Sequence, residues 1–263
     1  KEADMLSTPW QKEWNRMQRR EYAFLQKGRF QKPSRLTGFL ESKVPASMQD
    51  KLNKGFAKAF ELIFNKGTGI IEKTYDKESI LERFEDYKET AGIKNDYSSL
   101  KRFSKNASSS GNANLLFSGS AGIGMGLAGI GIPDIVIFTG SMLKGIYQVA
   151  LNFGYDYDSP EEKFFILKII ETSLSHGKRL DEGNNFLNEL IEKGLQIPEN
   201  YQQEGQIAIS SEAISSELLY TKFLQTIPIV GAVGGAYDAI YMKKILKYAE
   251  IKYHRRFLTE HTT

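Results

Sequence analysis

One long stretch of the sequence is almost free of charge, and this most constrains how the chain can fold. Residues 106–143 carry a single charged side chain, Asp134, and seven glycines lie between Gly119 and Gly140. Ile132-Pro133-Asp134 divides the stretch in two. Proline is favoured in the first turn of a helix, and an acidic residue there interacts with the helix dipole. We therefore predict a tight, glycine-rich helical hairpin.

The length of this stretch bears on where the hairpin lies. The uncharged run 115–132 has 18 residues, at the lower limit of the roughly 17–25 that a membrane-spanning helix needs. It is diluted by glycine and has no flanking lysine or arginine. We expect a hairpin that is buried or conditionally exposed, in preference to a constitutive transmembrane segment.

The rest of the chain has the apolar periodicity of helices. This spacing predicts helices that begin at Pro9 and occupy 46–66, 77–89, 97–108, 181–194 and 206–226, with a connector at 28–38. Ser159 and Glu162 form a capping box before a helix that runs to Leu174 and is apolar on nearly every face. Convincing period-2 strands are absent. We predict an all-α, single multi-helix domain over 1–263, with an amphipathic portion at 1–110 and the glycine-rich hairpin and helical core at 111–263.

A second glycine-rich apolar segment, 223–242, has Asp238 as its only charge. Small residues four apart, such as Gly122 with Gly126, line one helix face and let another helix approach closely. Each lone acid is interpreted either as an ion or substrate contact, or as a helix-start carboxylate (Asp134) and a partner for a nearby base (Asp238). The predicted helix-packing surface or ligand groove comprises Gly122, Gly124, Gly126, Gly129, Asp134, Gly231, Gly234, Gly235 and Asp238.

The segment Gly124–Gly129 also matches the GxGxxG pattern of dinucleotide-binding folds. That pattern requires a preceding strand and an acidic residue about 20 positions later. The preceding apolar run is short, and Asp134 comes too early. Helix packing is therefore the favoured interpretation, and no cofactor is predicted.

The two ends of the chain are basic and the middle is acidic. Residues 1–35 have a net charge of +5 and residues 243–263 of +4, which leaves −6 for the rest. Basic ends indicate an anionic partner, such as phospholipid headgroups or a docking protein, unless they are solvated helix faces. Nucleic acid is not expected, because no binding module is recognisable. The predicted anionic-surface residues are Arg16, Arg19, Arg20, Lys243, Lys244, Lys247, Arg255 and Arg256.

Catalytic chemistry has little support in the sequence. The chain has no cysteine, which excludes disulfides, thiol nucleophiles and cysteine-based metal sites and fits a reducing cytoplasm. It has three histidines and neither an HExxH nor a GxSxG motif. We assign no catalytic residue and no metal site.

Several motifs, taken in order, resemble the EcsC protein family. They are Trp14, Lys32–Leu36 with Val44-Pro45, Gly122–Asp134, Gly154–Asp156 with Ser159–Glu162, and Ile227–Ala236 continuing to Tyr253–Leu258. The family takes its name from a protein encoded beside the subunits of an ABC transporter in Gram-positive bacteria. The resemblance implies an accessory role in ABC-type transport or secretion, and it supplies no catalytic motif.

Three functions follow as hypotheses. The first is a non-catalytic, lipid-interacting accessory protein of the cytoplasm, peripheral to the inner face of the membrane, with an anionic membrane surface and an ABC transporter subunit as partners. The second is a hydrolase of peptides or lipids with a carboxylate or metal site. The third is a soluble protein-interaction scaffold.

Overall fold

All regular structure in the part of the chain that the structure describes is helical, which confirms the all-α prediction. The computed structural model describes residues 8–30, 46–66, 68–94, 96–109, 133–225 and 234–262. Its helices are α1 (Pro9–Phe30), α3 (Ala46–Lys66), α4 (Thr68–Glu72), α5 (Lys77–Lys94), α6 (Tyr97–Ser109), α8 (Pro133–Asn152), α9 (Pro160–Leu174), α10 (Gly177–Glu192), α11 (Gln203–Gln225) and α12 (Gly234–Thr262).

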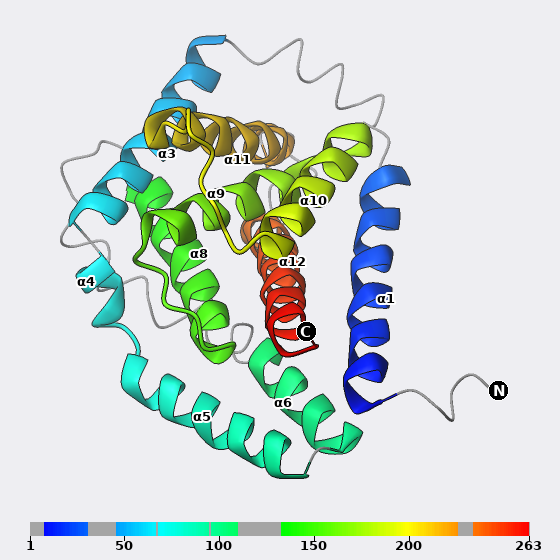
Figure 1. Cartoon of the computed structure of the whole chain (residues 1–263). Helices are drawn as coiled ribbons and strands as arrows, with labels where there is room; N and C mark the ends of the chain where they lie inside the picture. The colour runs from blue at the N-terminus through cyan, green and yellow to red at the C-terminus, as the bar shows by residue number, and fades with distance from the viewer. Residues whose placement is uncertain are drawn as a thin grey trace.

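The helices pack around α9 and α12, which Figure 1 shows at the centre with α12 viewed nearly end-on. Helices α1, α6, α8, α9, α10 and α11 all contact α12, while α3 and α11 pair along one side. Helix α9, whose sequence is apolar on nearly every face, is buried over most of its length. Its apolar side chains with no exposed surface are Phe165, Ile166, Leu167, Ile169 and Ile170.

Two of the predicted helix starts are confirmed by their caps. The Gln11 amide donates to Thr8 Oγ1 at 3.1 Å before α1, and the Glu162 amide donates to Ser159 Oγ at 3.1 Å before α9. The capping box at α9 is only half formed, however. The Glu162 carboxylate binds side chains of α12 in place of the helix start, because it is buried where stronger donors are available.

The prediction of a connector at 28–38 was wrong about the residue at which the first helix ends. Helix α1 continues through Gly28 to Phe30. Gly28 is buried against the Leu180 side chain of α10, so that an added Cβ would overlap Leu180. This glycine permits close packing of α1 on α10 and does not mark a turn.

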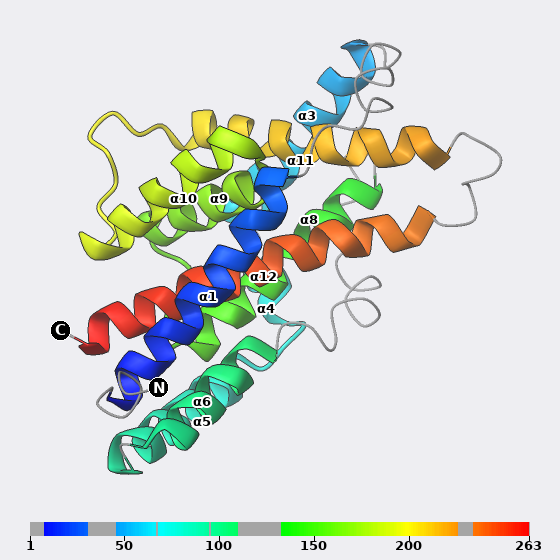
Figure 2. The ribbon, with the colours of Figure 1, turned by 90° about the vertical axis from the view of Figure 1, so that its right-hand side faces the viewer.

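Helices α8 and α12 run in the same direction and begin at the same end of the molecule (Figure 2). Near their other end, the ring of Phe153, which follows α8, stacks on His254 of α12 with centroids 5.5 Å apart. Helix α11 runs the opposite way and ends where α12 begins. We call this region the α8/α12 end. The glycine-rich sequence 110–132 and the apolar sequence 226–233, which directly precede α8 and α12, lie outside the described residues.

No helix among the described residues is long and apolar enough to cross a membrane. The run 115–132, for which the sequence predicts the first half of the hairpin, is not among them. Whether the hairpin forms stays a prediction.

Gly154 offers a test of the packing between α5 and α8. It has φ +83°, and an added Cβ would overlap the Phe84 ring. We expect Gly154→Ala to lower the free energy of unfolding by about 2 kcal/mol or more, because a left-handed alanine and a displaced ring are both unfavourable. Urea unfolding monitored by circular dichroism measures this change.

Gly205→Ala on α11 is the matched control, since a Cβ added at Gly205 would meet no atom within 4 Å and alanine favours a helix over glycine. It should not lower stability. Equal losses in the two variants would contradict the packing described for Gly154.

Candidate functional site

The structure tests the predicted glycine groove only in part. Gly122, Gly124, Gly126, Gly129 and Gly231 lie outside the described residues. Gly234, Gly235 and Asp238 occupy the first turns of α12, and Asp134 is the second residue of α8. The predicted helix start at Pro133 is confirmed, and the groove itself stays a prediction.

The predicted basic surface is mostly turned inward, which corrects the expectation of eight exposed charges. Arg19, Lys243 and Lys247 are exposed. Arg255 is buried, with only 8% of its surface exposed, and Arg16, Arg20, Lys244 and Arg256 are half-buried. Carboxylates on neighbouring helices hold most of these side chains inside the molecule.

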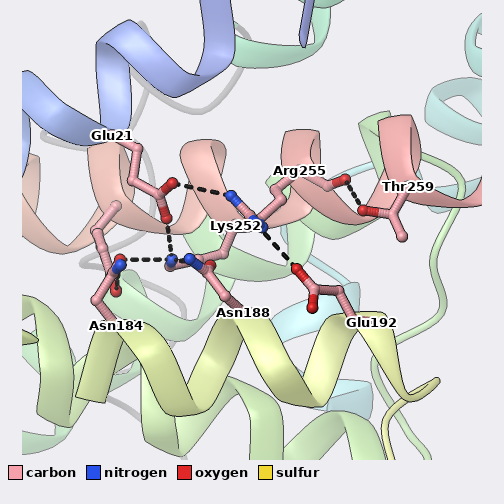
Figure 3. A network of polar contacts seen from close by, with 8 residues as sticks. Glu21, Asn184, Asn188, Glu192, Lys252, Arg255 and Thr259 are labelled. Carbon is pink, nitrogen blue, oxygen red and sulfur yellow. Dashed lines mark hydrogen bonds and ion pairs between the residues drawn. The ribbon is translucent and has the colours of Figure 1, made fainter. Parts of the chain in front are cut away.

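Lys252 and Arg255 of α12 form the centre of a buried polar network with α1 and α10 (Figure 3). The Lys252 ammonium donates to Glu21 of α1 at 2.5 Å, to Asn184 Oδ1 at 2.6 Å and to Asn188 Oδ1 at 2.7 Å. Its three protons therefore have three acceptors, which a fully buried ammonium requires. Arg255 bridges Glu21 at 3.0 Å and Glu192 of α10 at 3.1 Å.

Burial and neighbouring charges shift the pKa values of Lys252 and Glu21 in this network. Burial lowers the pKa of Lys252 to about 8, although Glu21 acts to raise it. Burial acts to raise the pKa of Glu21, but Lys252 and Arg255 outweigh it and hold that pKa below its ordinary value. The carboxylate thus stays ionised and pairs with both bases of α12, while Glu192 supplies a second negative charge to Arg255.

Two further ion pairs fix α12 in the same way. Arg256 donates to Glu162 of α9 at 2.7 Å, and Tyr253 donates to the other oxygen of that carboxylate at 2.5 Å. Arg20 of α1 donates to Glu250 at 2.9 Å. We refer to Glu21, Glu162, Glu192, Lys252, Arg255 and Arg256 as the α12 ion-pair network.

A buried histidine lies beside this network. His254 has no exposed surface, and its Nε2 lies 3.4 Å from Glu13 Oε1 of α1. Burial, with smaller effects from Arg20 and Arg16, holds the pKa of His254 well below its ordinary value. The ring is therefore neutral at pH 7 and packs as part of the core against Phe153.

The acidic partners of α12 were missed at the level of sequence, although a signal existed. Glu13 and Glu21 lie four residues before and after Met17, so all three share one face of α1. Met17 is fully buried in the core. Carboxylates that recur within an apolar stripe indicate buried ion pairs, and the excess of bases near the C-terminus supplies the partners.

A groove of about 910 Å³ opens between α9, α10 and α11, and we call it the α9–α11 groove. Its polar contacts include a hydrogen bond between His176 Nε2 and Glu217 Oε1 at 2.7 Å and an ion pair between Lys168 and Glu171 at 2.7 Å. Gln206 beside the groove donates to Glu171 at 2.8 Å. Sequence reasoning assigned no role to any of these residues, because they are scattered over three helices.

The hydrolase hypothesis required a carboxylate or metal site. Within the described residues, no group of three or more His, Asp or Glu side chains is arranged to hold a metal ion. The buried carboxylates Glu21 and Glu162 are both engaged by basic side chains of α12.

Replacement of Glu21 tests whether the network holds the fold together. We expect Glu21→Gln to lower the free energy of unfolding by about 3–5 kcal/mol, because it leaves Lys252 and Arg255 buried without their shared carboxylate. Glu192→Gln is the matched control, since Glu192 also binds Arg255 but its side chain is 54% exposed. It should cost under about 1 kcal/mol.

Urea unfolding of the three proteins at pH 7 measures the difference. A loss for Glu21→Gln no larger than that for Glu192→Gln would show that the buried pairs contribute nothing beyond what a surface ion pair does.

Comparison with known proteins agrees with the arrangement of motifs along the chain. The model of the EcsC protein family matches residues 11–258, which include every described helix in whole or in large part. No curated protein and no solved structure matches the chain. The match spans nearly the whole sequence, and the chain therefore belongs to the EcsC protein family.

Proposed function

We propose that this protein is a non-catalytic accessory protein that binds an anionic membrane surface through its α8/α12 end. In this proposal it acts in the cytoplasm, at the inner face of the membrane, beside an ABC-type transport or secretion system. The observation that carries the proposal is the common location of the helix ends that adjoin both glycine-rich apolar sequences.

The arrangement of α8, α11 and α12 supports this orientation. The starts of α8 and α12 and the end of α11 lie at one end of the molecule (Figure 2). The sequences 110–132 and 226–233 contain no charged residue and adjoin these helix ends. Two uncharged sequences joined to the same end give that end the apolar surface with which a protein can contact acyl chains.

The exposed residues of α12 near this end favour a membrane interface. Ile240, Lys243 and Lys247 lie on one face of the helix, because they are three and four residues apart. Both lysines are exposed, and Ile240 is 55% exposed, as few large apolar side chains of the described chain are. An exposed apolar residue flanked by lysines is typical of helices at a lipid surface.

The α12 ion-pair network reduces the number of basic side chains that are available to attract phospholipid headgroups. Arg255 and Arg256 are bound to carboxylates of α1, α9 and α10, so they contribute little attraction toward phospholipid headgroups. In this proposal, Lys243 and Lys247 provide the attraction toward phospholipid headgroups. Each exposed base near an anionic leaflet contributes on the order of 1 kcal/mol.

The link to an ABC-type system has a separate basis. It comes from membership in the EcsC family, whose founding protein is encoded beside the subunits of such a transporter. A membrane-surface protein of this kind is placed to meet the cytoplasmic portions of a transporter.

Co-sedimentation with vesicles tests the proposal. The wild-type protein should bind phosphatidylglycerol vesicles and not phosphatidylcholine vesicles at low salt. The Lys243→Gln/Lys247→Gln variant should bind the anionic vesicles roughly 30-fold more weakly, since two contributions of about 1 kcal/mol are lost.

Lys101→Gln/Lys105→Gln on α6 is the matched control, because these lysines are also exposed and four residues apart. It should bind within about twofold of wild type. An equal loss of binding in both variants would show that the whole charged surface attracts the vesicles and that the α8/α12 end has no special role. If the wild-type protein does not bind anionic vesicles, membrane association is refuted.

A further inference from the structure

We propose that the α9–α11 groove binds a basic amphipathic helix of a partner protein. This site lies apart from the α8/α12 end, and the inference does not depend on membrane binding. The argument rests on the shape of the groove, the charge of its walls and the apolar side chains exposed between them.

The shape of the groove follows from how three helices pack. Helices α10 and α11 both pack extensively on α9 and far less on each other, and residues of all three helices line the groove. The lining residues run from Arg179 to Phe186 along α10 and from Ile209 to Glu217 along α11. At a rise of 1.5 Å per residue, each wall is about 11–12 Å long, or about two helical turns.

The charge of the groove is acidic. Its lining includes four glutamates, against one lysine, one arginine and the histidine; the glutamates are Glu171, Glu182, Glu212 and Glu217. Glu182 of α10, which also pairs with the exposed Lys178 at 3.1 Å, and Glu212 of α11 are both exposed and lie on opposite walls. They frame the opening with negative charge, which favours a partner that presents lysine or arginine on both sides of its contact face.

The groove also exposes apolar surface between these charges. Phe186 of α10 is 37% exposed and Ile209 of α11 is 48% exposed, and both line the groove. They are two of the few large apolar side chains exposed in the described part of the chain. Apolar anchors within an acidic rim are the complement of a helix with apolar residues at i, i+3, i+4 and i+7 and bases beside them.

The dimensions favour a helix over a small ligand. A space of about 910 Å³ is near the upper limit for small-molecule sites, which usually enclose most of their ligand. This groove is lined by residues of one face of α10 and one face of α11. Two turns of a third helix fit that geometry, because helices pack at 8–10 Å between axes.

A designed peptide tests the inference. The probe is a fluorescein-labelled, 18-residue helix of leucine and lysine, with leucine every third or fourth position, and binding is followed by fluorescence anisotropy. We expect saturable one-to-one binding to the wild-type protein. Glu182→Lys/Glu212→Lys and, separately, Ile209→Asp should each weaken binding roughly tenfold or more.

Glu85→Lys/Glu89→Lys on α5 is the control, because it changes the net charge equally at two exposed sites. It should change binding less than twofold, and circular dichroism of each variant checks that the fold is retained. If the control variant weakened peptide binding as much as the groove variants, the proposed site would be overturned. The same holds if a peptide with glutamate in place of lysine bound the wild-type protein as tightly as the lysine peptide.

Sedimentation velocity adds one more outcome. A wild-type dimer that Ile209→Asp converts to a monomer would assign the groove to a second copy of this chain and overturn the proposed partner. A wild-type protein and variant with the same sedimentation coefficient, together with the expected peptide binding, would support a heterologous helix.

Discussion

The structure depends on a carboxylate that is buried together with two bases. Glu21 of α1 binds both Lys252 and Arg255 of α12, at a depth where an unpaired charge would be prohibitively unfavourable. This requirement draws α1, near the N-terminus, and α10 onto α12, near the C-terminus, over separations of more than 60 residues. The basic helix α12 therefore becomes the centre of the fold instead of its surface.

Because carboxylates inside the molecule pair with most bases of α12, two surfaces of opposite charge remain for binding. At the α8/α12 end, the exposed Lys243 and Lys247 follow the apolar segment 223–242, whose one charge is Asp238, and we propose that they face anionic lipid. The α9–α11 groove carries the opposite charge, so an anionic leaflet would repel it. A protein with one end for a membrane and an acidic groove for a basic helix has the two contacts that an accessory protein of a transporter needs.

The sequence was sufficient to predict the all-α class and most of the helices, but not α4 or the end of α1. It also did not predict that the basic side chains of α12 are buried. Helix starts at Pro9, Pro133 and Pro160 follow from local chemistry that acts over one turn. The burial of Arg255 follows from Glu21, more than 200 residues away, and no local pattern reports such a pairing. The groove was not predictable for the same reason, because α9, α10 and α11 each contribute one ordinary helix face and only their packing creates the space.

The absence of cysteine from the chain allows a direct test of which surface meets the membrane. Ile240→Cys on α12 and Tyr22→Cys on α1 replace exposed apolar residues, one beside Lys243 and one beside the arginines of α1. Each variant is labelled with an environment-sensitive fluorophore and mixed with phosphatidylglycerol vesicles. The account predicts a blue-shifted emission for the label at 240 and none for the label at 22. A blue shift at 22 alone would contradict it, and would return the membrane contact to the basic N-terminal helix.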